Sequence, residues 1–114
     1  MGLTKQGAAM LIGNFIAESG LDPQGCRGDR GTACGLGQWR FGRTEGLPEG
    51  YLEQLRWAVE IEMVRDFGGH HLKELLVNPA ASSADIMVGL KAWERWGFEG
   101  GRRAFGLEIL SQIQ

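Results

Sequence analysis

The chain has 114 residues, the size of one domain built around a single hydrophobic core. Hydrophobic residues make up 43% and charged residues 23% of it, and the formal net charge of −2 argues against a nucleic-acid binder that neutralises phosphates. No stretch approaches the roughly 20 apolar residues that would cross a bilayer. We therefore expect one domain over residues 1–114, with no nucleic-acid partner and no membrane insertion.

The first predicted element is a helix that ends on a polar pair. Thr4 is a favourable N-cap for it. Apolar residues then recur at helical spacing, at Ala8, Leu11, Ile12, Phe15 and Ile16. The helix is expected to end at Ser19, because Gly20 readily takes the left-handed conformation of a helix stop.

A glycine-rich loop, in which a small hairpin is possible, is expected from Gly20 to Gly37. Cys26 and Cys34 flank its central part. A disulfide between them would clip a short loop and indicate an oxidising destination. Two small buried side chains that never pair are the alternative, and the sequence does not decide between them.

The rest of the chain is predicted to be helical. Glycine or proline marks most of the breaks, and Gly68–Gly69 is expected to end the longest of these segments. The expected segments run from near Gln38 or Trp39 to Gly46, over 51–66, over 72–77, from a cap at Ser82 or Ser83 to about Trp96, and over 102–113. The predicted fold class is therefore mainly α, with five or six short helices around the glycine-rich loop.

Glu18 is the first candidate for chemistry. It lies in the last turn of the first helix, where unpaired carbonyl groups carry partial negative charge, and Phe15 and Leu21 add apolar surroundings. Both effects favour the protonated carboxyl, which is the form that a general acid needs near neutral pH. A lone glutamate at a helix end is usually a solvated surface residue, so this assignment depends on a second group.

Asp29 is the second candidate, in a loop that can fold back over the end of the first helix. Two carboxyls in unlike environments are what acid-catalysed cleavage of a glycosidic bond requires. Glu18 would protonate the leaving oxygen, and Asp29 would hold a water molecule on the other face of the sugar. The alternative for Asp29 is a plain salt bridge with Arg27 or Arg30.

The stretch "AESG" followed by "GDRGTACGLGQW" resembles the lysozyme-like superfamily, which includes goose-type lysozymes and lytic transglycosylases. In that superfamily the catalytic glutamate stands in a Glu-Ser pair at a helix end, matched here by Glu18-Ser19. A Gly-Leu-x-Gln element that lines the glycan cleft is matched by 35–38, and the Gly-Asp-Arg-Gly segment, whose aspartate helps to position water, is matched by 28–31.

The nearest resemblance is to the lysozyme domains of phage tails and lysins. That group has a Gly-Asn step before the Glu-Ser pair and a tryptophan after the glutamine, matched here by Gly13-Asn14 and Gln38-Trp39. The late segment "AWERWG", at 92–97, also resembles it. Goose-type enzymes have a second aspartate just after the glutamine element, where this chain has Arg40.

This resemblance implies an α+β lysozyme-like domain whose glycine-rich loop or small hairpin forms the glycan cleft. The activity it implies is that of a muramidase, which cleaves the β-1,4 bond between N-acetylmuramic acid and N-acetylglucosamine. A lytic transglycosylase and a non-catalytic wall-binding or virion structural domain are the alternatives. The candidate substrate-binding residues are Ser19, Gln38, Trp39 and Arg40. For Trp39 the alternative is a place in the hydrophobic core. Arg40 is one of several loop arginines that can face the anionic cell wall.

No cofactor or metal is implied, because the adjacent His70 and His71 have no third ligand at a useful spacing. The N-terminus does not have the pattern of a signal peptide, since Lys5 and Gln6 interrupt it. Action on the cell wall, in the periplasm or outside the cell, would then depend on delivery by a holin, a virion or lysis. A free lysin of this kind is expected to be a monomer.

Overall fold

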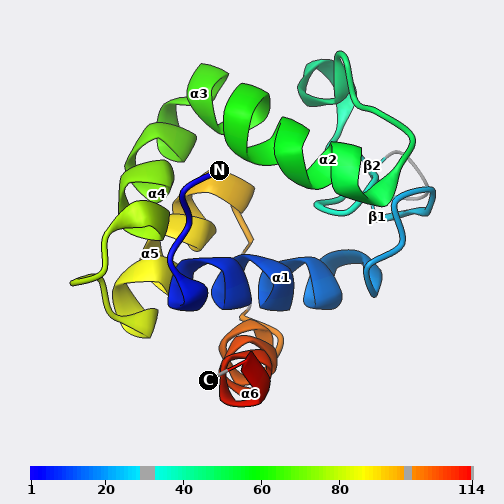
Figure 1. Cartoon of the computed structure of the whole chain (residues 1–114). Helices are drawn as coiled ribbons and strands as arrows, with labels where there is room; N and C mark the ends of the chain where they lie inside the picture. Colours follow the sequence, from blue (N-terminus) through cyan, green and yellow to red (C-terminus); the bar gives the residue numbers. More distant parts are fainter. Residues whose placement is uncertain (29–32, 97–98, 114) are drawn as a thin grey trace.

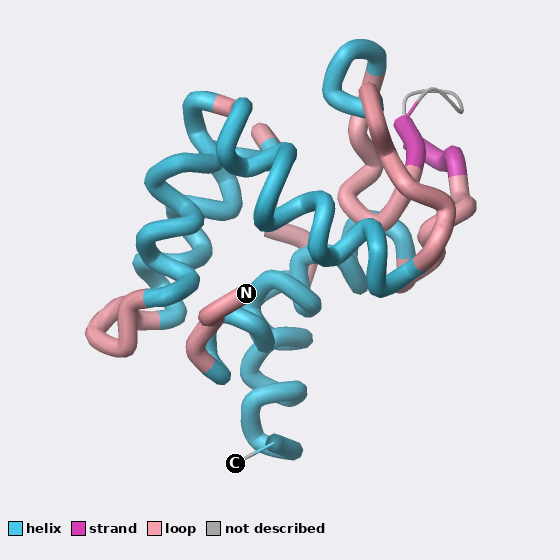
Figure 2. Tube along the Cα trace, turned by 45° about the horizontal axis from the view of Figure 1, so that its top comes forward, coloured by secondary structure: helices cyan, strands magenta, loops and turns pink. Residues whose placement is uncertain are grey.

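The computed structural model describes residues 1–28, 33–96 and 99–113, and the part of the chain that it describes is mainly helical (Figure 1). The α-helices are α1 (Lys5–Ser19), α2 (Tyr51–Trp57), α3 (Met63–Arg65), α4 (Phe67–Val77), α5 (Ser83–Glu94) and α6 (Arg102–Ile113). The strands β1 (Cys26–Gly28) and β2 (Ala33–Cys34) lie at the end of the molecule opposite α4 and α5 (Figure 2). This architecture confirms the mainly α fold class.

Helix α1 forms as the sequence predicts. The Thr4 side chain accepts a hydrogen bond from the backbone N–H of Gly7 at 2.9 Å. At the other end Gly20 adopts a left-handed conformation with φ 65°, and its N–H donates to the carbonyl of Ile16. The helix runs through the middle of the molecule, with α6 packed across it (Figure 1).

The contact between α1 and α6 is backbone against backbone. A Cβ atom added to Gly13 would lie 2.6 Å from the carbonyl oxygen of Arg102 and 2.6 Å from the amide nitrogen of Gly106. A Cβ added to Gly106 would lie 2.7 Å from the Met10 side chain. The two glycines therefore allow the start of α6 to approach the last turns of α1.

The glycine-rich loop contains the small hairpin. Strands β1 and β2 are antiparallel, with Cys26 opposite Cys34, and a disulfide joins these two residues. This settles the open pairing of the two cysteines in favour of the disulfide. Cys34 also forms an isolated bridge with Trp39, which folds the segment after β2 back against the hairpin.

Several element boundaries differ from the prediction. The helical turn after the hairpin is a 3-10 helix, η2 (Phe41–Thr44), which starts later than expected. The expected helix over 51–66 is divided, because a π-helical turn, η3 (Ala58–Glu62), separates α2 from α3. Helix α5 ends at Glu94, where Arg95 takes a left-handed conformation with φ 57°, and not near Trp96.

The prediction that Gly68–Gly69 ends a helix is wrong. The break falls at Asp66, whose side chain caps α4 by accepting from the N–H of Gly69 at 3.2 Å. The glycines are instead needed for close packing. A Cβ at Gly68 would lie 2.8 Å from the Ala92 carbonyl oxygen, and one at Gly69 would lie 2.4 Å from that of Met63.

Aromatic side chains form the centre of the core. Trp39 makes tilted or edge-to-face contacts with Phe15, Trp57 and Trp93, at ring-centroid distances of 5.8, 4.9 and 6.0 Å. These residues come from α1, α2, α5 and the segment after β2, so the cluster fixes the hairpin region to the helices. Among the described residues, no helix is both long enough and apolar enough to span a membrane.

Candidate active site

Glu18 lies in the last turn of α1, and its side chain is 17% exposed. Its Oε1 accepts a hydrogen bond from Nη2 of Arg102, the first residue of α6, and the two groups form an ion pair. The carboxyl is therefore neither in open solvent nor fully enclosed. It is held at the junction of α1 and α6 with part of its surface accessible.

Arg102 is the main residue of this junction that sequence reasoning missed. Its side chain is 8% exposed, and besides Glu18 it contacts the Asn14 Oδ1 at 2.9 Å through Nε and the Glu99 carbonyl at 2.8 Å through Nη1. Its guanidinium also lies over the Trp96 ring, 4.7 Å from the centroid. A cation in the first turn of a helix is unfavourable unless a nearby negative charge compensates it. The position of Arg102 at the start of the predicted helix over 102–113 was therefore a signal in the sequence that it has such a partner.

Ser19 connects the end of α1 to the turn at residues 35–38. It is buried, and its hydroxyl lies 3.1 Å from the Phe15 carbonyl oxygen and 2.9 Å from that of Leu36, both as acceptors. With its hydroxyl used in this way, Ser19 does not offer a group to a substrate in this structure. It fixes where Glu18 lies relative to the Gly-Leu-Gly-Gln segment.

Gln38 is half-buried in that same segment, with a positive φ of 51°. Its Nε2 donates to the carbonyls of Gly25 and Gly35, both at 2.9 Å, so the amide joins the start of the hairpin to the turn after it. The structure thus brings Gln38 close to the elements around Glu18, and gives its amide nitrogen a role within the loop.

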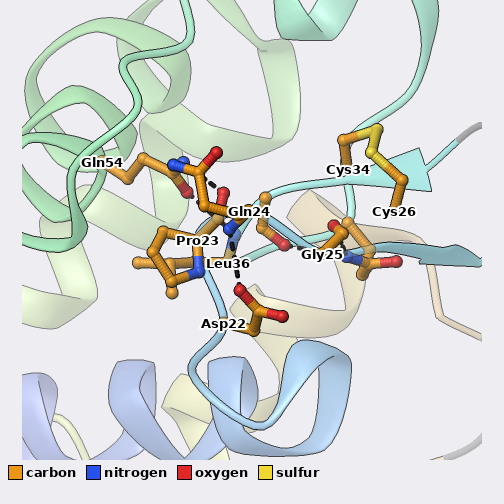
Figure 3. Close-up of a disulfide and its surroundings, with 10 residues drawn as sticks. Asp22, Pro23, Gln24, Gly25, Cys26, Cys34, Leu36 and Gln54 are labelled. Atoms are coloured by element: carbon orange, nitrogen blue, oxygen red, sulfur yellow. Dashed lines mark hydrogen bonds between the residues drawn. A yellow bond between two sulfur atoms is a disulfide. The ribbon is translucent and has the colours of Figure 1, made fainter.

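Gln54, from α2, is a second residue that the sequence analysis missed (Figure 3). It is 1% exposed, and its Oε1 accepts from the Leu36 N–H at 2.9 Å. Its Nε2 donates to the carbonyls of Pro23 and Pro48 at 2.7 and 2.8 Å. A single amide therefore holds three loop segments, and only a glutamine or asparagine can donate and accept in this way.

Trp39, Trp93 and Trp96 differ in how far their side chains are exposed. Trp39 and Trp93 are 1% and 0% exposed, so neither presents a ring face on which a sugar could stack. This corrects the expectation that Trp39 contacts substrate, because its ring is used in the aromatic core. Trp96 is only partly buried and lies against Arg102, which leaves it as the tryptophan nearest to the Glu18 ion pair.

Glu94, the last residue of α5, belongs to the same region. Its Oε1 is shielded from solvent and has no hydrogen-bond partner among the described residues. Burial raises the pKa of Glu94 well above its ordinary value, and the nearby charge of Glu18 raises it further. Glu62 acts in the same direction, whereas the guanidinium groups of Arg43 and Arg102 oppose the rise.

Arg43 and Glu62 form an ordered network beside Glu94. Nε of Arg43 contacts the Glu62 Oε1 at 2.7 Å, and its Nη2 donates to the Trp93 carbonyl at 3.0 Å. Glu62, which is buried, also accepts from the Trp93 indole N–H. The guanidinium of Arg43 is therefore held by Glu62 and the Trp93 carbonyl, although its side chain is still 25% exposed.

The structure describes only some of the remaining candidate residues in the loop. Asp29, the expected base, and Arg30 lie outside the described residues. Arg40 is exposed just before η2. A surface pocket lined by Met1, Leu52, Glu53, Leu55 and Arg56 contains none of the candidate site residues.

A mainly helical domain, with a glutamate-serine pair closing its first helix against a glycine-rich loop, has the features of a lysozyme-like domain. The sequence matches the phage tail lysozyme family over residues 1–65, and the chain belongs to that family. Family membership indicates a peptidoglycan-lytic phage domain. Comparisons with curated proteins and with solved structures gave no match. Glu94 and Arg102 lie beyond the matched range.

Proposed function

We propose that this domain is a muramidase that hydrolyses the β-1,4 bond between N-acetylmuramic acid and N-acetylglucosamine. The observation that carries the proposal is the placement of Glu18. Its carboxyl closes α1, is 17% exposed, and is held by Arg102 next to the loop segment that Ser19 ties down. A carboxyl fixed at the edge of a glycine-rich loop can reach the oxygen of a bound glycan.

In this mechanism Glu18 protonates the glycosidic oxygen as the bond breaks, and Asp29 orients a water molecule and takes its proton. In this structure Glu18 is ion-paired with Arg102, and the proposed role requires its protonated form. We expect the anionic, ring-containing substrate to meet Arg40, which is exposed, and Trp96, which is partly buried, while Gln38 supports the loop.

The test is the substitution Glu18→Gln, which keeps the shape of the side chain and removes its acid proton. We expect clearing of purified peptidoglycan to fall by about 10²-fold or more, since loss of a general acid has this order of effect. Glu74→Gln removes the same charge from the exposed surface of α4 and is the matched control. A Glu18→Gln variant with more than about a tenth of wild-type clearing would exclude Glu18 as the acid.

A lytic transglycosylase acting on the same bond is the second candidate, and Arg40 favours it. This arginine stands where goose-type enzymes have a second water-positioning aspartate. A transglycosylase needs no such group, because the 6-hydroxyl of the sugar attacks internally. Mass spectrometry of digested sacculi separates the two: hydrolysis gives reducing ends, whereas transglycosylation gives anhydro-muropeptides. Normal hydrolysis by Asp29→Asn would exclude only the role of Asp29 as the base and would leave the rest of the proposal standing. The absence of any product would favour a wall-binding domain.

A further inference from the structure

The guanidinium of Arg102 is fixed at more points than an ion pair with Glu18 requires. Its Nε donates to the Oδ1 of Asn14 at 2.9 Å, its Nη1 donates to the Glu99 carbonyl at 2.8 Å, and its Nη2 donates to Glu18. Its Cζ lies 4.7 Å from the centroid of the Trp96 ring. A planar group that is held through all three nitrogens and one face cannot turn without breaking several contacts at once.

Asn14 holds this guanidinium from the side of α1. It is 0% exposed, and its Nδ2 has no hydrogen-bond partner among the described residues. A buried amide with an unpaired N–H group is costly, so packing alone does not account for an asparagine at this position. Its contribution is the Oδ1 that accepts from Arg102. Asn14 and Glu18 are four positions apart in α1 and share one face of the helix, and one guanidinium therefore reaches both.

The two oxygens of the Glu18 carboxyl have different surroundings. Oε1 accepts from Arg102, whereas Oε2 has no hydrogen-bond partner within the described part of the chain. A protonated carboxyl has one O–H donor and keeps an acceptor on its other oxygen. Arg102, which can only donate, can therefore stay bonded to Oε1 whether Glu18 is ionised or neutral. The proton of the neutral form must then be on Oε2.

We propose that Arg102, held in place by Asn14, is a positioning residue that keeps the acid proton of Glu18 on Oε2, the oxygen left for the substrate. The inference rests on the proposed function, in which Glu18 is the general acid. It also explains how the ion pair with Arg102 is compatible with an acid role, because the same guanidinium serves both protonation states of the carboxyl.

The step is balanced in atoms and electrons. The Oε2–H bond of Glu18 breaks, its electron pair stays on Oε2, and the proton forms a bond with the glycosidic oxygen. The glycosidic C–O bond breaks, and its electron pair stays on the leaving oxygen. Glu18 is then a carboxylate beside the guanidinium of Arg102, which stabilises the new charge. It regains a proton from water after product release.

The first test is the steady-state cleavage of soluble peptidoglycan fragments by Arg102→Lys and Arg102→Met. Lysine keeps the positive charge, but its single ammonium group cannot reproduce the fixed fork that binds Asn14 and Glu18 together. We expect kcat to fall about tenfold in both variants with KM within about twofold, because a misplaced acid slows bond breaking and leaves glycan binding intact. Rates are measured well below the unfolding midpoint of each variant.

A wild-type kcat in Arg102→Lys would overturn the proposal, since the charge alone would then be enough. Arg103→Met, at the next and exposed position of α6, is the control that must leave kcat and KM unchanged. Asn14→Leu keeps the size of a buried side chain and removes its acceptor. It should lower kcat about threefold or more with KM unchanged, and a wild-type kcat in this variant would likewise contradict the proposal.

The second test combines Arg102→Met with Glu18→Gln. If Arg102 acts through Glu18, its loss should change the residual rate of Glu18→Gln by less than about twofold. A further tenfold loss would show that Arg102 serves another part of the site, and the proposal would fail. If Glu18→Gln is impaired and Arg102→Lys is not, only the positioning role fails. If Glu18→Gln is active, the proposed function itself fails.

The third test needs neither activity nor a folded Arg102 variant. In protein with nitrogen-15 labelled arginine, NMR measures hydrogen exchange at the Nε–H of Arg102. We expect exchange at least about tenfold slower than at Arg56, whose side chain is 73% exposed, and loss of this protection in Asn14→Leu. Equally fast exchange at Arg102 and Arg56 in the wild type would show that the guanidinium is not held, and would overturn the proposal.

Discussion

The carboxyl of Glu18 and the guanidinium of Arg102 form an ion pair that joins the last turn of α1 to the first turn of α6. Each charge stands at the helix end where the helix dipole disfavours it. Their pairing removes both penalties at once, since each residue compensates the partial charge that the other one faces. The candidate active site is thus also the junction between two helices, formed by residues that lie 84 positions apart in the chain.

Substitution of Arg102 by methionine should cost about 2 kcal/mol or more in free energy of unfolding, because it removes hydrogen bonds to charged and buried groups. Urea unfolding followed by circular dichroism measures this. Arg103→Met is the matched control, since Arg103 is exposed and its Nε contacts Ser83 at 3.1 Å. Equal losses of unfolding free energy in the two variants would mean that Arg102 does not stabilise the junction of α1 and α6.

Gly13→Ala should destabilise the domain by about 1–3 kcal/mol and lower its activity. The added methyl group would meet the Arg102 carbonyl oxygen and the Gly106 nitrogen at 2.6 Å, and backbone atoms cannot move aside cheaply. Helix α6 must then shift and carry Arg102 away from Glu18. Gly42→Ala, where nothing lies within 4 Å of the new methyl group, should leave the unfolding midpoint almost unchanged.

Gln54→Leu should cost about 3 kcal/mol, since it leaves the Leu36 N–H and two carbonyls without their partner. The variant should also show faster amide hydrogen exchange at Leu36, which NMR reports directly. Gln24→Leu is the comparison, because Gln24 is exposed and its loss should change stability by no more than about 0.5 kcal/mol. Unaltered exchange at Leu36 would argue that the loop does not depend on Gln54.

Reduction of the Cys26–Cys34 disulfide should lower the free energy of unfolding by about 2–3 kcal/mol, the loss expected for a loop closed by a sequence separation of 8. Thermal unfolding with and without a phosphine reductant measures the shift. The double variant Cys26→Ser/Cys34→Ser should unfold at the reduced-protein temperature in both conditions. A reductant effect in that variant would show that the shift does not come from this bond.

Glu94 should make the domain less stable as the pH rises. The pKa of Glu94 is raised in the folded protein, so above its ordinary value of 4.5 the unfolded chain loses this proton while the folded protein keeps it. This contribution is complete below pH 4.5 and is lost as the pH rises through the folded-state pKa. Urea midpoints from acid to neutral pH should fall less steeply in Glu94→Gln than in the wild type, whereas Glu74→Gln should follow the wild type.

Local sequence signals predicted much of the helical framework correctly. The Thr4 cap and the Gly20 stop set the bounds of α1, and the capping box of Ser82 and Asp85 starts α5. These signals work because they concern backbone groups within one turn of the residue that satisfies them. They were misleading at Gly68, where glycine serves a contact with another helix and does not end its own.

The sequence by itself determined that a carboxyl would close the first helix, next to a serine and ahead of a glycine-rich loop, since adjacency along the chain is enough for that. Only the tertiary structure decided which groups surround this carboxyl. Arg102 and Glu94 come from the ends of α6 and α5, and Trp39 turns into the core. The packing of distant helices brings these side chains together, and the spacing of residues along the chain does not encode their charge interactions.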